Sequence, residues 1–496
     1  MKRLCIGTNT EDTDIKTSLL AKEHNSTNWG LIDSVDYYPK ELGYYHTSIV
    51  DLTQSNIVII SKHFNQIIFL DQPIEEWMHP DNFERTWELA SHLPEEKIIY
   101  QNKSQFESVD YFTNLVKTNK SFCIFPFIEL LAPNGHTTVC CRSTTPITKI
   151  DNITDWTTDP DYKIIRDKML QGELVPEHCS VCYKDETLGM QSARQQETVE
   201  WANRLGIHTV EDLKKITDPV YYEVRPSNIC NLACRFCHPY LSSQLEKEFI
   251  AIGIHDSNVK IEYTNFDFVK INNIKKLYVS GGEPTAMVDL IAFMEKCIQL
   301  GKTDFEFIIN TNAHKFSNRM KELFKEFKNL SFIVSIDGYQ KVNDYVRWPS
   351  QWENTIENAQ YLVRNGHRIT FNSVVSIWTV SRWYELCLFL DSTFLESTIH
   401  GSLATSDGDI MSPFNYPGYE ELKTNLVKLK TINSYGNDKL FRFFVDALIE
   451  YVPLTDLGKL TKFFEYNDLL DKSRNVQLKD YIPELDQYRE LCYNKI

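Results

Sequence analysis

The sequence predicts an α/β protein whose central part is a parallel sheet that is closed or nearly closed. Across residues 215–400, apolar runs of strand length alternate with segments of helical periodicity, and this alternation is typical of repeated β–α units. Glycines, cysteines and polar residues follow several of the strand-like runs. Because ligands of such sheets bind at the C-terminal ends of the strands, these residues indicate where a functional site lies.

Residues 1–118 are predicted to form a small α/β domain, because short apolar runs alternate with helical patterns there. Strands are expected at residues 2–7, 29–33, 66–70 and 97–100. Helices are expected at residues 55–64 and 83–93. No glycine-rich phosphate loop follows the first run, and the sequence indicates no role for this domain.

Residues 119–200 are predicted to form a separate metal-binding module. They contain five cysteines, which are Cys123, Cys140, Cys141, Cys179 and Cys182. The last two form a C-x-x-C pair, and Asn134–Gly135 predicts the turn of a β-hairpin. Four thiolates can fully coordinate either a [4Fe–4S] cluster or one zinc ion. Both alternatives stay open, and either Cys140 or Cys141 can supply the hairpin ligand. Counted from Gly135, Cys140 stands where the hairpin cysteine falls in the SPASM/twitch modules that this segment resembles, and the resemblance therefore favours Cys140.

Residues 215–400 carry the repeated β–α units. The strands are predicted at residues 221–226, 275–280, 305–313, 330–338, 369–376 and 398–404. The helices between them are predicted at residues 288–301, 317–329 and 351–366. Residues 401–496 are expected to be mainly helical, with helices at 441–452 and 459–474 that pack on the sheet or close its mouth.

Composition narrows the class of protein. A chain of 496 residues is too long for one ordinary domain, and a net charge of −16 argues against a broad nucleic-acid-binding surface. No run approaches the ~20 apolar residues of a membrane span, and the acidic N-terminus does not resemble a signal peptide. We therefore expect a cytoplasmic location, where cysteines are metal ligands more often than disulfides.

The most informative pattern is the C-x-x-x-C-x-x-C spacing of Cys230, Cys234 and Cys237. Three thiolates can hold three irons of a [4Fe–4S] cube and leave the fourth iron open. The amino and carboxylate groups of S-adenosylmethionine can chelate an open iron. A zinc knuckle is the alternative for the spacing alone, but the Gly281–Pro284 segment after the next predicted strand argues against it.

Both motifs together resemble the radical S-adenosylmethionine superfamily, and this resemblance implies a partial (β/α)6 barrel. It implies that Phe236 packs beside the adenine, that the segment Gly281, Gly282, Glu283 and Pro284 binds the methionyl amine, and that glycine lets the backbone approach the ligand.

Residues after the next two predicted strands are further candidates for cofactor binding. Asn310, Thr311 and Asn312 could meet the ribose or the carboxylate of S-adenosylmethionine. The stretch with Ser335, Asp337 and Arg347 resembles a segment of SPASM/twitch enzymes, in which the arginine pairs with the methionyl carboxylate. Turn formation is the alternative role for each of these polar residues.

The segment 119–200 resembles the SPASM/twitch auxiliary-cluster modules, although such modules usually follow the radical domain and this one precedes it. The resemblance implies reductive cleavage of S-adenosylmethionine, with electrons from a donor such as flavodoxin or ferredoxin, and abstraction of hydrogen from a substrate. A second [4Fe–4S] cluster would permit net oxidation or crosslinking. A peptide is the favoured substrate, and amino sugars and small metabolites stay open. The alternatives are a methylthiotransferase-like enzyme acting on RNA and a non-catalytic iron–sulfur redox protein.

Overall fold

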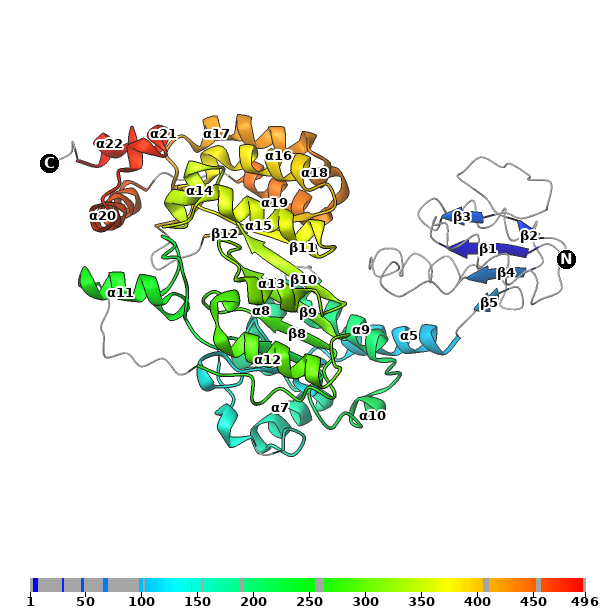
Figure 1. The fold of residues 1–496 in the computed structure, drawn as a ribbon. Helices are drawn as coiled ribbons and strands as arrows, with labels where there is room; N and C mark the ends of the chain where they lie inside the picture. Colours follow the sequence, from blue (N-terminus) through cyan, green and yellow to red (C-terminus); the bar gives the residue numbers. More distant parts are fainter. Residues whose placement is uncertain are drawn as a thin grey trace. The chain divides into compact units, whose positions relative to one another are not determined.

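The computed structural model describes residues 103–493 except 144, 154, 188–190, 255–262, 405–409 and 452–455, together with five strands nearer the N-terminus. Side chains are described from residue 111 onward, Asn134 excepted. The chain divides into two compact units, and Figure 1 labels most of their helices and strands. Unit 1 contains Met1–Ile128 and Thr157–Thr217, and unit 2 contains Glu129–Trp156 and Asp218–Ile496.

Unit 1 begins with a parallel sheet in the order β2–β1–β4–β5, and β3 also pairs with β1. The strands are β1 (Arg3–Gly7), β2 (Trp29–Gly30), β3 (His46–Ser48), β4 (Gln66–Phe69) and β5 (Ile98–Tyr100). They confirm the strands predicted at the N-terminus, whereas β3 was not predicted. The helices predicted at 55–64 and 83–93 lie outside the described residues.

Helices form the rest of unit 1 as described. They are α5 (Lys103–Thr118), α6 (Phe125–Ile128), α7 (Pro160–Gln171), α8 (Pro176–Thr187), α9 (Ala193–Leu205) and α10 (Val210–Leu213). The buried Arg194 of α9 joins three segments, since it pairs with Glu186 of α8 and donates to the carbonyls of Val116, Asn119 and Phe122. A buried guanidinium is stable only when its donors are satisfied in this way.

Unit 2 contains a seven-stranded parallel sheet in the order β12–β11–β10–β9–β8–β7–β6. The strands are β6 (Glu129–Leu131), β7 (Tyr221–Val224), β8 (Lys276–Val279), β9 (Glu306–Thr311), β10 (Leu330–Ser335), β11 (Arg368–Val375) and β12 (Thr398–Leu403). Sequential parallel strands require crossover connections, and the intervening helices provide them (Figure 1). Among the described residues the order runs between β12 and β6 without closing, so the predicted partial barrel is confirmed.

Two faces of this sheet differ in burial, because successive side chains of a strand point to opposite faces. In β9, β10 and β11 fully buried residues alternate with partly exposed ones. The crossover helices are α11 (Ser243–Ala251), α12 (Val288–Gln299), α13 (Asn318–Phe324), α14 (Lys341–Val346), α15 (Trp352–Arg364) and α16 (Trp383–Thr393). Cys297 of α12 is buried, as expected of a core residue.

The predicted helical region 401–496 is confirmed. Its helices are α17 (Tyr419–Leu426), α18 (Asn433–Asn437), α19 (Lys439–Glu450), α20 (Leu457–Arg474), α21 (Pro483–Asp486) and α22 (Arg489–Tyr493). In the described part of the chain, no helix is both long and apolar enough to cross a membrane.

The predicted module 119–200 coincides with neither unit. Its residues 129–156 belong to unit 2, and its remaining residues belong to unit 1. The strand β6 was not predicted, and it pairs in parallel with β7 at the edge of the barrel sheet. The predicted hairpin turn is present directly after it: Gly135 has a φ of 75°, and Leu131 forms an antiparallel bridge with Thr138.

Candidate functional site

The three cysteines of the C-x-x-x-C-x-x-C motif lie on the loop that follows β7. Cys234 is buried, whereas Cys230 and Cys237 are partly exposed. The amide of Cys237 donates to the carbonyl of Cys234 at 3.1 Å, so the second and third cysteines share one tight turn. Ser242 caps α11 and donates to the Leu232 carbonyl at 2.6 Å, which joins the start of the helix to the loop.

The three thiols lie close enough to influence one another electrostatically. Burial raises the pKa of Cys230 and of Cys234, and it raises the pKa of Cys237 to about 12. Cys234 raises the pKa of both other thiols further. A bound cation is therefore needed to hold all three as thiolates, and iron supplies such charge in a cluster.

The binding of three irons of a [4Fe–4S] cube by these three thiols stays a prediction. Within the described residues, no group of three or more His, Cys, Asp or Glu side chains is placed so that it could hold a metal ion. The thiolates of a cube each bind a different iron, so they do not converge on one ion as zinc ligands do.

The Gly281–Pro284 turn after β8 packs directly against the cysteine loop. The Gly282 amide donates to the Ser227 carbonyl at 3.0 Å, and the Glu283 amide donates to the Ile229 carbonyl at 2.7 Å. A Cβ atom on Gly282 would lie 2.2 Å from the Ile229 oxygen. Glycine is therefore required here for the approach of the cysteine loop, whereas the resemblance implied that the glycines let a ligand approach the backbone.

Glu283 is buried, and its carboxylate joins the turn to the end of β9. One carboxylate oxygen accepts from the amide and the hydroxyl of Thr285 and from the hydroxyl of Thr311. The other accepts from the Asn312 amide at 2.6 Å. Burial raises the pKa of Glu283, although these donors counteract the increase. Its contact with the ammonium of a ligand stays a prediction, as does the role of Pro284, which begins a 3-10 turn.

The side chain of Asn312 contacts the cysteine loop, whereas the side chain of Asn310 binds residues of the neighbouring strands. The Asn312 side chain donates to Asn231 Oδ1 at 2.8 Å and lies 3.9 Å from Cys230 Sγ. Asn310 instead donates to the Tyr278 hydroxyl at 3.0 Å and accepts from the Ser335 hydroxyl at 3.2 Å. These three residues are partly exposed and lie on β8, β9 and β10, on the face of the sheet away from the core.

Arg347 forms a buried ion pair with Asp337, with Nε 2.5 Å from Oδ2. The guanidinium also lies 4.0 Å from Cys234 Sγ and 5.8 Å from the centre of the Phe236 ring. Burial raises the pKa of Asp337, and Arg347 counteracts that increase. The expected pairing of Arg347 with a methionyl carboxylate stays a prediction, and it would require the guanidinium to serve two carboxylates.

The other five predicted metal ligands are distributed over both units. Cys123, Cys179 and Cys182 belong to unit 1, where burial and then the Cys182 thiol raise the pKa of Cys179 to about 12. Cys140 is buried and Cys141 is exposed, and both belong to unit 2. The auxiliary cluster and the choice between Cys140 and Cys141 stay predictions.

Sequence reasoning missed two residues of this site: Asn231 and Tyr278. Asn231 stands between two cysteines of the motif, where only the motif residues themselves attracted notice. Tyr278 could have been found from the alternation of β8, because every second residue of a strand faces the same side. Thr311 was expected to meet the cofactor, and in the structure its hydroxyl donates to the Glu283 carboxylate at 2.7 Å.

Residues 224–390 match the family model of the Radical SAM superfamily. An "uncharacterized protein" of Methanothermobacter thermautotrophicus is 27% identical over 157 residues, which are 32% of this chain and 53% of the relative. The chain thus spans about half the length of the curated relative that it matches.

Two solved structures show a distant likeness. Streptococcus suis SuiB bound to S-adenosylmethionine has 16% identity and a TM-score of 0.31, with 51% of this chain and 58% of that chain covered. Native anSMEcpe with bound AdoMet has 15% identity and a TM-score of 0.33, with 48% and 63% covered. Likeness of this size carries no conclusion about this chain.

Proposed function

Because residues 224–390 match the family model of the Radical SAM superfamily, we propose that this protein reductively cleaves S-adenosylmethionine and removes a hydrogen atom from a substrate. The family uses a [4Fe–4S] cluster and S-adenosylmethionine as its cofactors. When bound, they would supply one-electron reductive cleavage of a sulfonium C–S bond, with methionine as the leaving group and 5′-deoxyadenosine as the product that keeps the hydrogen atom taken from the substrate.

One observation carries this proposal: three strand ends converge on the loop with Cys230, Cys234 and Cys237. The Gly281–Pro284 turn after β8 donates two amide hydrogen bonds to this loop, and Asn312 after β9 donates a third from its side chain. The cysteines would hold the cluster, and these contacts would fix the loop around it. Phe236 and Arg347 lie beside the same cysteines and would bound the cofactor.

The substrate would bind over the partly exposed face of the sheet. Tyr278, Asn310 and Ser335 form a hydrogen-bonded row there, and such groups orient a polar substrate. A peptide is the substrate class that we propose, with flavodoxin or ferredoxin as the electron donor, and both follow from the resemblance to SPASM/twitch enzymes.

Product analysis tests the cleavage. Reduced, anaerobically reconstituted protein is expected to form 5′-deoxyadenosine and methionine, and the Cys230→Ala, Cys234→Ala, Cys237→Ala triple variant is expected to form neither. Cys297→Ala is the matched control, because this buried thiol belongs to the core of α12. Formation of deoxyadenosine by the triple variant would refute the assignment.

We further propose that Cys123, Cys140, Cys179 and Cys182 bind a second [4Fe–4S] cluster, which would accept an electron from the substrate and permit net oxidation. The triple variant would then retain about four irons per chain, and Cys140→Ala would lower this number more than Cys141→Ala. Zinc in place of iron would make the site structural. An iron that binds added methanethiolate would favour the methylthiotransferase-like alternative.

A further inference from the structure

The C-terminal helix α20 contacts the cysteine loop through a buried arginine that no motif includes. Arg235 directly follows Cys234, and its side chain is fully buried. Its guanidinium donates to the Tyr345 carbonyl at 2.9 Å, to Asn467 Oδ1 at 3.2 Å and to Asp471 Oδ1 at 2.6 Å. Two of these three acceptors belong to α20, so Arg235, one of the two residues between the second and third cysteines, is bound to a helix more than two hundred residues later in the chain.

Asp471 is the centre of this anchor. Its first carboxylate oxygen accepts from Arg235 and, at 2.7 Å, from the Tyr345 hydroxyl. Its second oxygen accepts from the Asn467 amide at 3.3 Å and from the Leu478 backbone amide at 2.8 Å. Asp471 is only 7% exposed, and a buried carboxylate with a cation and several donors is held in one position.

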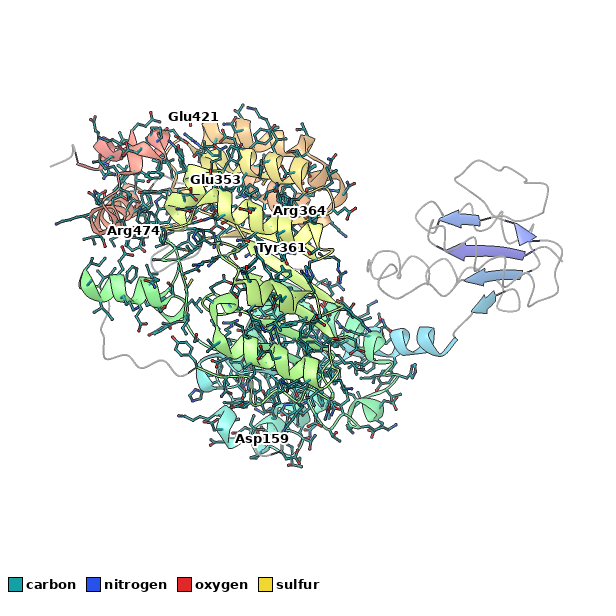
Figure 2. All side chains as sticks on the ribbon, in the orientation of Figure 1. Asp159, Glu353, Tyr361, Arg364, Glu421 and Arg474 are labelled. Atoms are coloured by element: carbon teal, nitrogen blue, oxygen red, sulfur yellow. The ribbon has the colours of Figure 1, made fainter. Side chains whose placement is uncertain are left out.

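The backbone of the cysteine loop is held from the same helix. The Tyr466 hydroxyl donates to the Arg235 carbonyl at 2.6 Å, and Arg474 donates to the Ala233 carbonyl at 2.7 Å. Arg474, which is labelled in Figure 2, also forms an ion pair with Glu248 of α11. Both residues flanking Cys234 therefore have their carbonyl groups bound by α20.

The amide groups of the same two residues are bound from another element. Ala233 donates to the Trp348 carbonyl at 2.6 Å, and Arg235 donates to the Val346 carbonyl at 2.8 Å. The segment around Cys234 is thus held between α20 and the end of α14, with its amides and its carbonyls both satisfied. A segment held in this way has little freedom to adjust around a bound group.

We propose that α20 is a positioning element for the iron–sulfur cluster, and that Tyr466, Asn467, Asp471 and Arg474 are its positioning residues. At 100° per residue, these four fall within about 140° of one face of the helix. Buried helix faces are ordinarily apolar, because buried polar groups are unfavourable without partners. Here each of the four polar side chains binds Ala233 or Arg235, the residues on either side of Cys234. Arg474 also forms the ion pair with Glu248 of α11.

This arrangement has a consequence for the cluster. The reduction potential of an iron–sulfur cluster depends on nearby charge, hydrogen bonds and solvent exposure. Asp471 balances the charge of Arg235. Without this carboxylate, a net positive charge would remain beside the cluster, and it would stabilise the reduced cluster, which carries the more negative charge.

The test compares Asp471→Asn and Tyr466→Phe with Glu465→Gln, a matched control that removes a carboxylate from an exposed position of the same helix. Hydrogen exchange is measured first, on the protein without its cluster. In both test variants, amides of residues 229–240 should exchange at least about fivefold faster than in the wild type, because each variant removes a hydrogen bond that restrains the loop. Amides of the β9–β11 strands should be unchanged, and the control should match the wild type throughout.

The second measurement is the midpoint potential of the reconstituted cluster, together with its electron paramagnetic resonance spectrum in the presence of S-adenosylmethionine. We expect Asp471→Asn to retain the wild-type iron content but to shift the potential upward and alter the spectrum. Tyr466→Phe should alter the spectrum with a smaller shift in potential. If Asp471→Asn does not fold, Tyr466→Phe alone tests whether α20 positions the cluster.

Unchanged loop exchange and an unchanged potential in Tyr466→Phe would overturn the inference. Uniformly faster exchange across unit 2 with an unchanged potential would also overturn it, because α20 would then serve the stability of the fold alone. The inference rests on the cluster of the proposed function, and the two fail differently. A wild-type chain that binds no cluster refutes the proposed function, whereas a normal wild-type cluster with indifferent variants refutes only the role of α20.

Discussion

Gly282 is the position where the smallest substitution should have the largest effect on the site. In Gly282→Ala, the added Cβ would lie 2.2 Å from the Ile229 oxygen and 2.6 Å from the Asn228 carbonyl carbon. Both contacts are with backbone atoms, so no flexible side chain can move away. The turn after β8 must therefore separate from the cysteine loop.

The magnitude follows from the contacts that separation would break. The amides of Gly282 and Glu283 each donate a hydrogen bond to the loop, and each such bond contributes about 1 kcal/mol. Overpacking of a tight contact adds about 1–3 kcal/mol. We expect Gly282→Ala to lower the free energy of unfolding of unit 2 by about 3–5 kcal/mol.

Urea unfolding followed by tryptophan fluorescence measures this change, and iron per chain after anaerobic reconstitution measures its effect on the site. Gly436→Ala is the matched control, because a Cβ at this helical glycine meets no atom within 4 Å. The control should unfold at the same urea concentration as the wild type or a higher one. Wild-type stability together with wild-type iron content in Gly282→Ala would show that the turn and the loop are not packed as described.

Three further variants test other parts of the structure. Glu283→Gln should lower the free energy of unfolding by about 1–3 kcal/mol. The backbone N–H groups of Thr285 and Asn312 donate to different carboxylate oxygens, so the NH2 group of the glutamine would face one of these donors in either orientation. Unfolding of this variant at the same urea concentration as the wild type would contradict this prediction. Burial, and then Glu353, raise the pKa of Asp344 to about 6, above the ordinary value of about 4, so its ionisation destabilises the folded state as pH rises through this range. Asp344→Asn should therefore raise the free energy of unfolding at pH 8 by about 1 kcal/mol after allowance for solvent screening. The increase should be smaller at pH 5, and an equal increase at both pH values would refute the raised pKa of Asp344. Arg194→Met should destabilise unit 1 by about 3–5 kcal/mol, because it leaves the Glu186 carboxylate without its cation; hydrogen exchange in α5 and α9 that matches the wild type would disprove this role.

The sequence predicted the strands and the location of the site because both depend on local patterns. Alternating strand and helix periodicity located the six strands from β7 to β12, and the motif residues follow their C-terminal ends. The strand β6 was missed because Glu129–Leu131 is only three residues long, too short to show a period. Its partner β7 begins ninety residues later in the chain, and no local pattern indicates such a pairing.

The contacts of the site were less predictable than its residues. Glu283 and Arg347 were identified as ligand-binding residues, but the structure shows that each already has protein partners. Asp471 attracted no attention in the sequence because it stands in an ordinary helical pattern. Its contact with Arg235 joins residues 236 positions apart, and only the folded chain brings them together.

The hydrogen bonds around the cysteine loop form a closed circuit that explains why the motif residues occur together. The Ile229 carbonyl binds the Glu283 amide, the Glu283 carboxylate binds the Asn312 amide, and the Asn312 side chain returns to Asn231 on the loop. Each link depends on the one before it, because the Glu283 carboxylate reaches Asn312 only while the glycine turn is seated on the loop. The chain thus fixes the position of Cys230 with its own groups, and α20 fixes the segment around Cys234 from the other side. A site whose supporting contacts are complete in this way is preorganised, so binding of a cluster need not order the loop.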